Sequence, residues 1–285
     1  MELQAKVPMV LNRVSLSGQN ELGEPSVRLE DINLTVTPGE WLSIVGVNGS
    51  GKSTLARLLA GLQLEHSVGE ITRGFAGEGI CPIVLQQPRA QLFGETPREE
   101  VIFALEWRGM AADQIPLLGE QALSKVGLTE LADDPWEKLS GGQQQLAAIA
   151  AATACETPLL VLDEVTSMLD EMNRDIVMRT ARELHKRGMT IIWVTQRLDE
   201  LEPDTRVVAL GEGRVIFDGE CREFLYGVSV PGEPAPLSPC LRVGLRLPYL
   251  AAMALELRLL GKLEDPLPLT AQEWRKVWGN AGDKG

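Results

Sequence analysis

A glycine-rich stretch near the start of the chain has the residue types needed to hold a polyphosphate. Residues 46–53 read Gly-Val-Asn-Gly-Ser-Gly-Lys-Ser, which fits the pattern G-x-x-x-x-G-K-[ST]. Glycines allow backbone N–H groups to face an anion, Lys52 can reach the β and γ oxygens, and the Ser53 hydroxyl can bind Mg2+. The stretch predicts an ATP-binding protein that uses Mg2+. The predicted nucleotide contacts are Gly46, Asn48, Gly49, Ser50, Gly51, Lys52, Ser53 and Thr54.

The segments on either side of this stretch are those that a phosphate-binding loop requires. Residues 41–45 are apolar and predict a buried parallel strand, and residues 54–60 predict a helix that ends at Gly61. In the order strand, loop, helix, the positive end of the helix faces the anion. The alternative, a glycine turn with an incidental lysine, does not account for this order.

A pair of carboxylates follows a second apolar run, residues 159–162. At a strand end, Asp163 is placed to hold Mg2+ through water, and Glu164 can take a proton from the water that attacks the γ-phosphate. An Asp-Glu pair at a strand end is also common as solvated charge. The phosphate-binding loop in the same chain favours the catalytic interpretation.

A second candidate anion site lies at residues 139–143, Leu-Ser-Gly-Gly-Gln, directly before a helical run at 144–155. Ser140, Gly141, Gly142 and Gln143 offer hydroxyl and N–H donors at a helix start. One chain does not need two γ-phosphate cradles, which suggests that this one faces a nucleotide held by another subunit. An ordinary serine-capped helix remains the alternative.

The order of predicted elements indicates an α/β fold. Residues 27–36 alternate apolar and polar side chains and predict an early strand, which a Pro-Gly turn at 38–39 connects to the strand at 41–45. Helical stretches separate the later apolar runs at 159–162 and 190–194, which favours a parallel sheet with crossover helices. Residues 206–210 and 214–217 flank a Gly-Glu-Gly turn and predict a hairpin. Four prolines between 231 and 239 indicate a linker. Two short helices are expected after it, the second with a capping box at Thr270 and Glu273, and they form either a surface appendage or a dimerisation unit.

The composition narrows the function classes. Hydrophobic residues make up 44% of the chain, and 27 Lys+Arg against 40 Asp+Glu give a net charge of -13, which disfavours a nucleic-acid partner. The cysteines show no C-x-x-C pair and predict free thiols in a reducing cytosol. The sequence has no signal peptide and no run of roughly 18 apolar residues, so we expect membrane contact to run through a partner. The cysteines are Cys81, Cys155, Cys221 and Cys240.

The order of phosphate-binding loop, Gln86, residues 139–143, Asp163-Glu164 and residues 167–170 resembles the ATP-binding subunit of an ABC transporter over about residues 8–226. The resemblance implies a P-loop NTPase core of ABC type over residues 1–228, with a parallel sheet, an antiparallel β subdomain and a helical subdomain at about 87–155. A linker at 229–240 and a carboxy-terminal helical extension at 241–285, used for dimerisation, would follow.

The resemblance also implies how the site works. Two such subunits would sandwich two ATP molecules, each between the phosphate loop of one subunit and the Ser-Gly-Gly-Gln of the other. Gln86 would sense the γ-phosphate and bind Mg2+ together with Ser53 and Asp163, while Glu164 acts in catalysis. Residues 167–170 would link the two sites.

Further stretches resemble the energy-coupling-factor (ECF) class of vitamin and metal importers. They are Leu-Gln-Gln-Pro at 85–88, Gln-Leu-Phe at 91–93, Glu-Glu-Val at 99–101, and the tail segments 244–248 and 267–270. The resemblance implies a peripheral ATPase at the cytoplasmic face of the cell membrane. A transmembrane coupling subunit would dock near Gln86 to Phe93, against Leu92 and Phe93, with Glu99 or Glu100 available to pair with arginine. A substrate-binding membrane subunit would be an indirect partner.

Four positions depart from the family pattern. Gln196 stands where a histidine contacts the γ-phosphate, and Gly18 or its neighbours stand where an aromatic ring stacks on adenine. Leu146 replaces an arginine, and Val165 replaces a small residue or proline. A glutamine amide can donate a hydrogen bond but cannot become cationic. We therefore expect Gln196 to act in catalysis in place of the histidine, and we expect the chain's own ATP site to be partly degenerate. The chain would then be one half of an ATPase heterodimer. A tolerated variant in a working homodimer is the alternative.

Other function classes fit less well. A soluble ABC-type ATPase in DNA repair or translation is disfavoured by the acidic charge and the single cassette. A GTPase would carry an Asn-Lys-x-Asp stretch after the third strand, and the chain has none there. A binding module that never turns over ATP stays open because of Gln196.

Overall fold

The computed structural model describes residues 7–19, 25–62, 66–228 and 237–282 of the 285-residue chain. These residues form two compact units. The first comprises Met1–Leu42 with Ser53–Val194, and the second comprises Ser43–Lys52 with Thr195–Gly285. Strand β3 (Trp41–Val45) is shared, because its first two residues belong to the first unit and its last three to the second.

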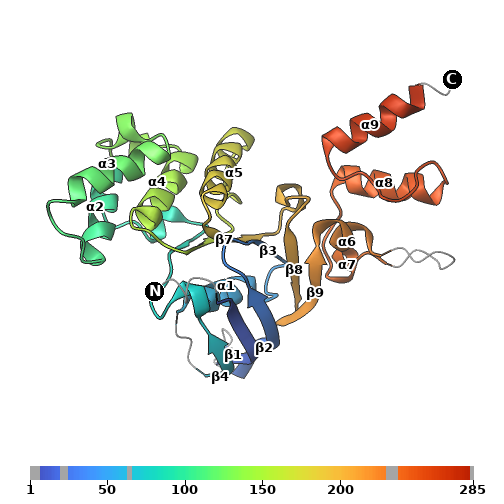
Figure 1. Cartoon of the computed structure of the whole chain (residues 1–285), viewed down its shortest axis with the longest axis horizontal. Coiled ribbons are helices and arrows are strands. Elements are labelled where there is room, and N and C mark those ends of the chain that lie inside the picture. Colours follow the sequence, from blue (N-terminus) through green and yellow to red (C-terminus); the bar gives the residue numbers. More distant parts are fainter. Residues whose placement is uncertain (1–6, 20–24, 63–65, 229–236, 283–285) are drawn as a thin grey trace. The chain divides into compact units, whose positions relative to one another are not determined.

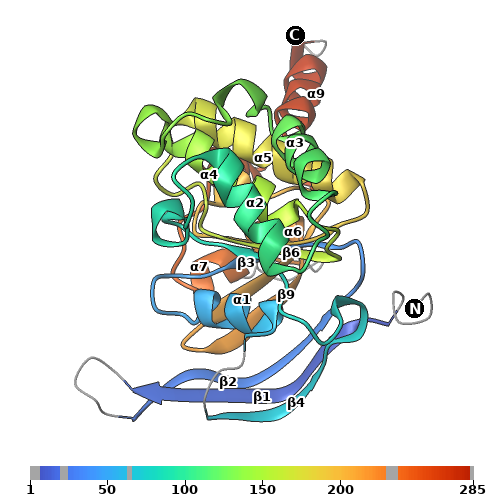
Figure 2. The same ribbon diagram turned by 90° about the vertical axis from the view of Figure 1, so that its left-hand side faces the viewer.

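An antiparallel sheet in the first unit has the strand order β2-β1-β4 (Figure 2). Its strands are β1 (Met9–Gln19), β2 (Pro25–Val36) and β4 (Ser67–Thr72). The sequence predicted β2 but not β1, whose alternation of apolar residues is interrupted. The register shifts between Leu11 and Val14, and Arg13 within that shift has a φ of 50°, typical of a bulge. The extra residue breaks the period of two on which a strand prediction rests.

Parallel strands form the second sheet of this unit, in the order β5 (Ile83–Val84), β6 (Leu159–Asp163), β7 (Thr190–Thr195) and the start of β3. Strand β6 pairs with β5 and β7 in parallel, for example Val161 with Ile83 and Ile192. All positions of β6 and β7 are buried, as expected for a sheet covered on both faces. Asp163 therefore lies at the carboxyl end of a central strand.

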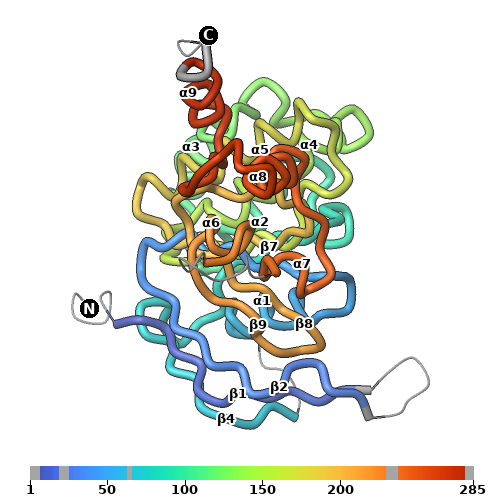
Figure 3. The backbone as a smooth tube through the Cα atoms, turned by 90° about the vertical axis from the view of Figure 1, so that its right-hand side faces the viewer, coloured from blue at the N-terminus to red at the C-terminus, as the bar shows by residue number. Residues whose placement is uncertain are grey.

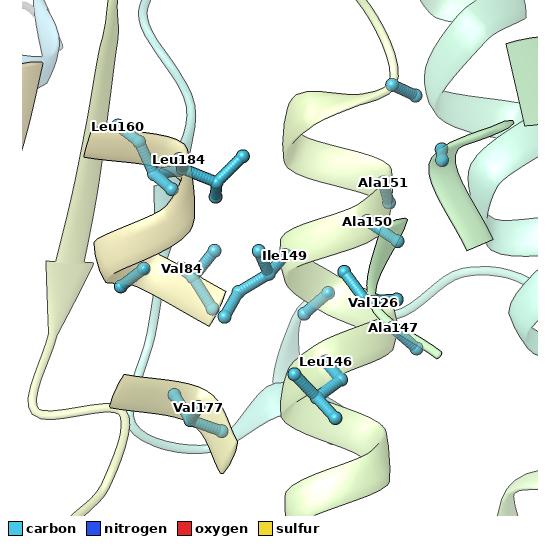
Figure 4. Close-up of a cluster of buried hydrophobic side chains, with 14 of the residues drawn as sticks. Val84, Val126, Leu146, Ala147, Ile149, Ala150, Ala151, Leu160, Val177 and Leu184 are labelled. Atoms are coloured by element: carbon cyan, nitrogen blue, oxygen red, sulfur yellow. The ribbon is translucent and has the colours of Figure 1, made fainter. Parts of the chain in front are cut away.

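Helices cover this sheet. They are α1 (Lys52–Ala60), α2 (Pro97–Trp107), α3 (Ile115–Lys125), α4 (Gly141–Thr153) and α5 (Glu171–Lys186). Helices α2, α3 and α4 gather in one group (Figure 1), and α4 is buried along most of its length. Ile149 of α4 points toward Val84 and Leu184 in the core of the unit (Figure 4). Short 3-10 helices lie at Gly74–Ala76, Pro88–Ala90, Thr129–Leu131 and Trp136–Lys138.

The second unit contains the predicted hairpin, β8 (Arg206–Gly211) and β9 (Arg214–Glu220), in the strand order β3-β8-β9. Its helices are α6 (Cys221–Tyr226), α7 (Pro239–Arg242), α8 (Tyr249–Leu259) and α9 (Ala271–Gly282), with a 3-10 turn at Leu198–Glu200 (Figure 3). The capping box at Thr270 is present, since Glu273 N–H donates to Thr270 Oγ1 at 3.0 Å and Thr270 N–H to Glu273 Oε2 at 3.3 Å.

The carboxy-terminal extension shares one hydrophobic core with β8 and α6. Trp274 of α9 is buried in the same cluster as Val207 of β8 and Phe224 of α6. Two polar contacts reinforce the junction. Tyr226 Oη donates to the Pro268 carbonyl at 2.6 Å, and Arg222 pairs with Glu273 at 2.8 Å. The apolar cluster therefore crosses the boundary expected between a core ending at 228 and an extension beginning at 241.

The predicted linker is described only in part. Residues 229–236 lie outside the described residues, whereas Pro239 and Cys240, also assigned to the linker, belong to α7. Proline fits there because the first turn of a helix leaves its N–H groups without intrahelical acceptors. The remaining domain boundaries stay a prediction. The mixed parallel and antiparallel sheets with covering helices confirm the predicted α/β class.

The shared core gives a testable expectation for two tryptophans of α9. Trp274 is 1% exposed and Trp278 is 57% exposed. We expect Trp274→Ala to lower the free energy of unfolding by about 3–5 kcal/mol, the usual cost of emptying a buried aromatic site. The matched variant Trp278→Ala should cost under about 1 kcal/mol. Urea unfolding measures both.

Hydrogen exchange distinguishes a shared core from a separate extension. With a shared core, Trp274→Ala also reduces protection of the amides in β8. If only amides after residue 238 lose protection, the extension folds by itself.

Candidate functional site

Residues 46–52 of the phosphate-binding loop lie in the second unit and have the backbone shape that the glycines predict. Gly46, Gly49 and Gly51 have φ angles of 154°, 80° and 101°, which side chains disfavour. A Cβ atom on Gly46 would lie 2.5 Å from both the Leu210 carbonyl oxygen and Ser50 Oγ. The loop therefore closes against β8 only because residue 46 has no side chain.

Hydrogen bonds hold this loop from inside and outside. Ser50 N–H donates to the Val47 carbonyl at 3.2 Å, and Lys52 Nζ donates to the same oxygen at 3.1 Å. Gly213, in the turn between β8 and β9, donates its N–H to the Ser50 carbonyl at 3.1 Å. Lys52 is only 5% exposed and begins α1, so its ammonium is held at a helix start, where anions bind.

The predicted metal ligands Ser53 and Asp163 are in contact in the first unit. Ser53 Oγ donates to Asp163 Oδ1 at 3.1 Å, and Asp163 is 5% exposed at the end of β6. A hydroxyl and a carboxylate are hard oxygen ligands of the kind Mg2+ prefers, with water and phosphate completing its shell. Among the described residues no group of three or more His, Cys, Asp or Glu could hold a metal. The Ser53–Asp163 pair fits a Mg2+ that binds together with a nucleotide, because the ion would take its remaining oxygen ligands from phosphate and water.

Glu164 has a backbone conformation that its residue type rarely adopts. Its φ is 51°, in the left-handed region, where a non-glycine residue stores strain of about 1–3 kcal/mol. The surroundings hold it there, since Glu164 N–H donates to the Val194 carbonyl at 3.0 Å and Ser167 Oγ donates to the Glu164 carbonyl at 2.8 Å. Such strain concentrates at functional sites.

Gln86 follows β5 at the same edge of the sheet as Asp163, because β5 and β6 are parallel neighbours. Its position is fixed through its backbone. The buried Gln145 side chain on α4 donates to the carbonyls of Leu85 and Gln86 at 3.2 and 3.0 Å. Gln86 is thus tied to the helix that begins at Ser140.

The Ser-Gly-Gly-Gln stretch caps α4 and packs against α5. Ser140 Oγ accepts from Gln143 N–H at 3.3 Å, and Gln143 Oε1 accepts from Ser140 N–H at 2.8 Å, a complete capping box. A Cβ on Gly142 would lie 2.4 Å from Asn173 Oδ1, so glycine is required for this approach. The structure thus contains the serine-capped helix named above as the alternative, and a helix start remains able to accept an anion.

The residues after Glu164 pack against this stretch within the same unit. A Cβ on Gly141 would lie 3.4 Å from Leu169 Cδ2. Asp170 caps α5 by accepting from Asn173 N–H at 2.8 Å and from Asn173 Nδ2 at 2.9 Å. These bonds, the backbone one above all, hold the pKa of Asp170 below its ordinary value.

Gln196 contacts the phosphate-binding loop inside the second unit. Its Nε2 donates to Asn48 Oδ1 at 2.6 Å. Thr195 before it donates its hydroxyl to Glu200 Oε2 at 2.7 Å, and the Arg197 N–H after it donates to Thr195 Oγ1 at 2.9 Å. Gln196, which replaces the family's histidine, is therefore held with its side-chain amide next to the phosphate-binding loop.

Gln144 and Gln145 were not identified from the sequence as site residues. Both are buried, and Gln144 Nε2 donates to the carbonyls of Trp136 and Leu139 at 2.9 and 3.1 Å. A run of three glutamines at the start of an alanine-rich helix was the available signal, since a helix this apolar must bury its polar residues with partners.

An apolar groove of about 440 Å³ opens in the first unit between α2, α4 and the segment after Gln86. Phe93, Phe103 and Trp107 form a stacked row along it, with ring centroids 5.0 and 6.2 Å apart. Phe93 and Trp107 are 75% and 83% exposed. Side chains of this size rarely remain in water without a binding partner, so the groove is a candidate docking surface.

The predicted acidic residues beside the groove hold the loop that shapes it. Glu100 Oε2 accepts from the N–H groups of Phe93 and Gly94 at 2.7 and 2.9 Å, and Glu99 Oε2 accepts from Glu95 N–H at 2.8 Å. Glu100 also lines the groove. Each of these carboxylates already accepts backbone N–H groups, and pairing of Glu99 or Glu100 with an arginine stays a prediction.

A family model and several known relatives match this chain. A family model described as "ABC transporter" matches residues 29–167. The energy-coupling factor transporter ATP-binding protein EcfA1 of Halalkalibacterium halodurans is 40% identical over 203 residues, 67% of this chain and 72% of that protein. EcfA1 of Streptococcus thermophilus is 35% identical over 260 residues, 88% of this chain and 91% of that protein.

Solved structures agree with these relatives. CbiO1 from Clostridium perfringens, part of the ABC transporter complex cbiONQ, has a TM-score of 0.65 and 31% identity, covering 76% of this chain and 90% of that one. A dimeric ATP-binding cassette, MJ0796, in a post-hydrolysis state with ADP and Pi has a TM-score of 0.64 and 25% identity, covering 75% of this chain and 99% of that one.

None of the described helices has the length and apolar character needed to cross a membrane. The family match, the relatives and the solved structures all indicate the same family. The chain belongs to the ATP-binding proteins of ABC transporters, the ATPases that couple ATP hydrolysis to transport.

Proposed function

We propose that the chain is the ATP-hydrolysing subunit of an importer of the energy-coupling-factor class, which takes up a vitamin or a transition metal. The Ser53–Asp163 hydrogen bond at 3.1 Å carries the ATPase part of the proposal, because it joins the phosphate-loop motif to the strand-end carboxylate. The ECF part is supported by the relatives, whose names state that class. The subunit acts at the cytoplasmic face of the membrane.

Each candidate residue has one task in this mechanism. The loop N–H groups from Gly46 to Ser53, with Thr54 after them, and the Lys52 ammonium bind the phosphates. Ser53, Asp163 and Gln86 would hold Mg2+, which would neutralise phosphate charge. Glu164 accepts a proton from the attacking water.

The Ser140–Gln143 stretch completes the site of a second ATPase subunit. Ser140 Oγ and the first N–H groups of α4 lie at a helix start, which favours a phosphate oxygen. The ordinary capping role is compatible with this task, since the capping box fixes the stretch in one shape. The solved structure of the cassette MJ0796 bound to ADP and Pi is a dimer, and this supports pairing of two such subunits. The carboxy-terminal extension adds a dimerisation surface.

Gln196 makes the chain's own site partly degenerate, and we favour a heterodimer in which the partner ATPase has the histidine. An amide can orient the γ-phosphate but cannot offer it a positive charge. A homodimer would carry the weaker group at both sites. The membrane-bound coupling subunit then receives the movement of both cassettes as they close on ATP and reopen, while the substrate-binding subunit is reached only through it.

The groove along Phe93, Phe103 and Trp107 is the docking site for the coupling subunit. An apolar helix face can cover the stacked rings. One oxygen of Glu100 supports the Phe93 and Gly94 amides, and an arginine on the incoming helix pairs with the same carboxylate from the groove side. The alternative role in DNA repair or translation offers no occupant for this groove.

Hydrolysis by the purified chain tests the degenerate site. We expect nucleotide binding with slow turnover, and we expect Gln196→His to raise the turnover number by on the order of 100-fold, the lower range for one positioned catalytic group. Phosphate release measures turnover and a fluorescent ATP analogue measures binding.

Two variants serve as controls for that experiment. Glu164→Gln gives the blank rate, and Lys52→Ala should remove nucleotide binding. Rapid turnover by the unaltered chain would contradict the degenerate site and support a homodimer. A rate that Gln196→His leaves unchanged would show that residue 196 does not limit hydrolysis.

The variant Glu100→Gln tests the docking proposal. The control variant is Glu106→Gln, which makes the same substitution on the exposed side of α2. We expect Glu100→Gln to weaken binding to the detergent-solubilised membrane subunits by about 10-fold or more, because a charge-assisted bond to arginine is lost. Glu106→Gln should bind as the unaltered chain does. Equal binding by both variants would contradict the role of Glu100.

A further inference from the structure

The segment after β7 is anchored by a buried carboxylate. Glu200 has a side chain only 2% exposed and accepts the Thr195 hydroxyl at 2.7 Å. Its second oxygen lies 3.5 Å from Arg197 Nε. Because a buried carboxylate is costly without such partners, Glu200 strongly favours the arrangement that places Thr195 and Arg197 around it.

Gln196 lies between these two anchored residues. Arg197 N–H also donates to Thr195 Oγ1 at 2.9 Å, so the backbone on both sides of residue 196 is fixed. Its side chain then reaches Asn48, whose Oδ1 accepts from Gln196 Nε2 at 2.6 Å. All of these residues belong to the second unit.

The Asn48 end of this contact is also held. The neighbouring Val47 carbonyl accepts from Ser50 N–H and from Lys52 Nζ, at 3.2 and 3.1 Å. Asn48 therefore stands on a turn that the loop itself fixes. The Gln196 amide is thus fixed at its backbone by Glu200 and at its tip by Asn48.

We propose that Asn48 and Glu200 are positioning residues for Gln196, which they hold for contact with the γ-phosphate. A glutamine has more side-chain torsions than a histidine, so it loses more conformational entropy when it is ordered. The hydrogen bond to Asn48 orders the Gln196 side chain before the nucleotide binds. It uses one N–H of the Gln196 amide and fixes the direction of the second N–H. The inference rests on the proposed role of Gln196 at the γ-phosphate.

ATP and ADP affinities measured on the full chain test the inference, since only ATP has the γ-phosphate. We expect Gln196→Ala to lower the preference for ATP over ADP by about tenfold, the scale of one hydrogen bond to a charged group. Asn48→Ala should lower it in the same way, and the double variant should lower it no further than Gln196→Ala alone. Affinity for ADP should stay within about twofold.

A threonine pair tests the Glu200 anchor. Thr195→Val removes the hydroxyl bond to Glu200, whereas Thr205→Val removes a comparable bond, 2.9 Å to the Glu202 carbonyl, elsewhere in the same unit. We expect only Thr195→Val to lower the ATP preference, by roughly threefold to tenfold. Glu200→Gln should act in the same direction.

Three results would overturn the inference. Additive losses from Asn48→Ala and Gln196→Ala would mean that Asn48 acts on the nucleotide independently. Equal losses of ATP and ADP affinity would mean that Asn48 and Glu200 only support the fold. An ATP preference untouched by Gln196→Ala would contradict the proposed γ-phosphate contact itself, whereas the first two results leave that contact standing.

Discussion

The absence of a side chain at Gly46 is the constraint on which the phosphate-binding loop depends. The loop turns where the Leu210 carbonyl and Ser50 Oγ leave no room for a Cβ atom. With that close approach, Ser50 can receive the Gly213 N–H and Lys52 can reach the Val47 carbonyl. A loop that its own contacts hold in one shape loses less conformational entropy when it binds an anion.

Local motifs were the part of the site that the sequence could predict. The phosphate-binding loop, the strand before Asp163 and the cap at Ser140 each depend on residues close together in the chain, so spacing and residue type were sufficient. The contacts that join them were beyond such reasoning. Gln145 reaches Gln86 across about sixty residues of sequence, and Gln196 reaches Asn48 across 148. No periodicity reports contacts of this kind.

Backbone conformation limited the prediction of the fold in the same way. Strand β1 was not predicted because the bulge at Arg13 interrupts the alternation of its apolar residues. The positive φ angle of Glu164 could not be predicted either, because no sequence pattern indicates it. The helices of the extension were predicted from their pattern, but burial of Trp274 against α6 was not, because helical spacing does not say which surface covers the apolar face. The neighbourhood of Gly18 was also beyond sequence-based prediction. A Cβ atom on Gly18 would lie 3.4 Å from Cγ and Nε of Arg28, which belongs to the next strand.

Helix α4 connects three features of the first unit: the Ser-Gly-Gly-Gln stretch, the segment at Gln86 and the apolar groove. It begins at the Ser140 cap, its buried Gln145 holds the Gln86 carbonyl, and Ala148 and Ala151 line the groove. Its alanines are buried in the core of the unit, where small side chains allow close packing against neighbouring elements. In the docking proposed above, the groove, the Gln86 carbonyl and the Ser140 cap all contact this one helix, so any coupling between the groove and the nucleotide would be reciprocal.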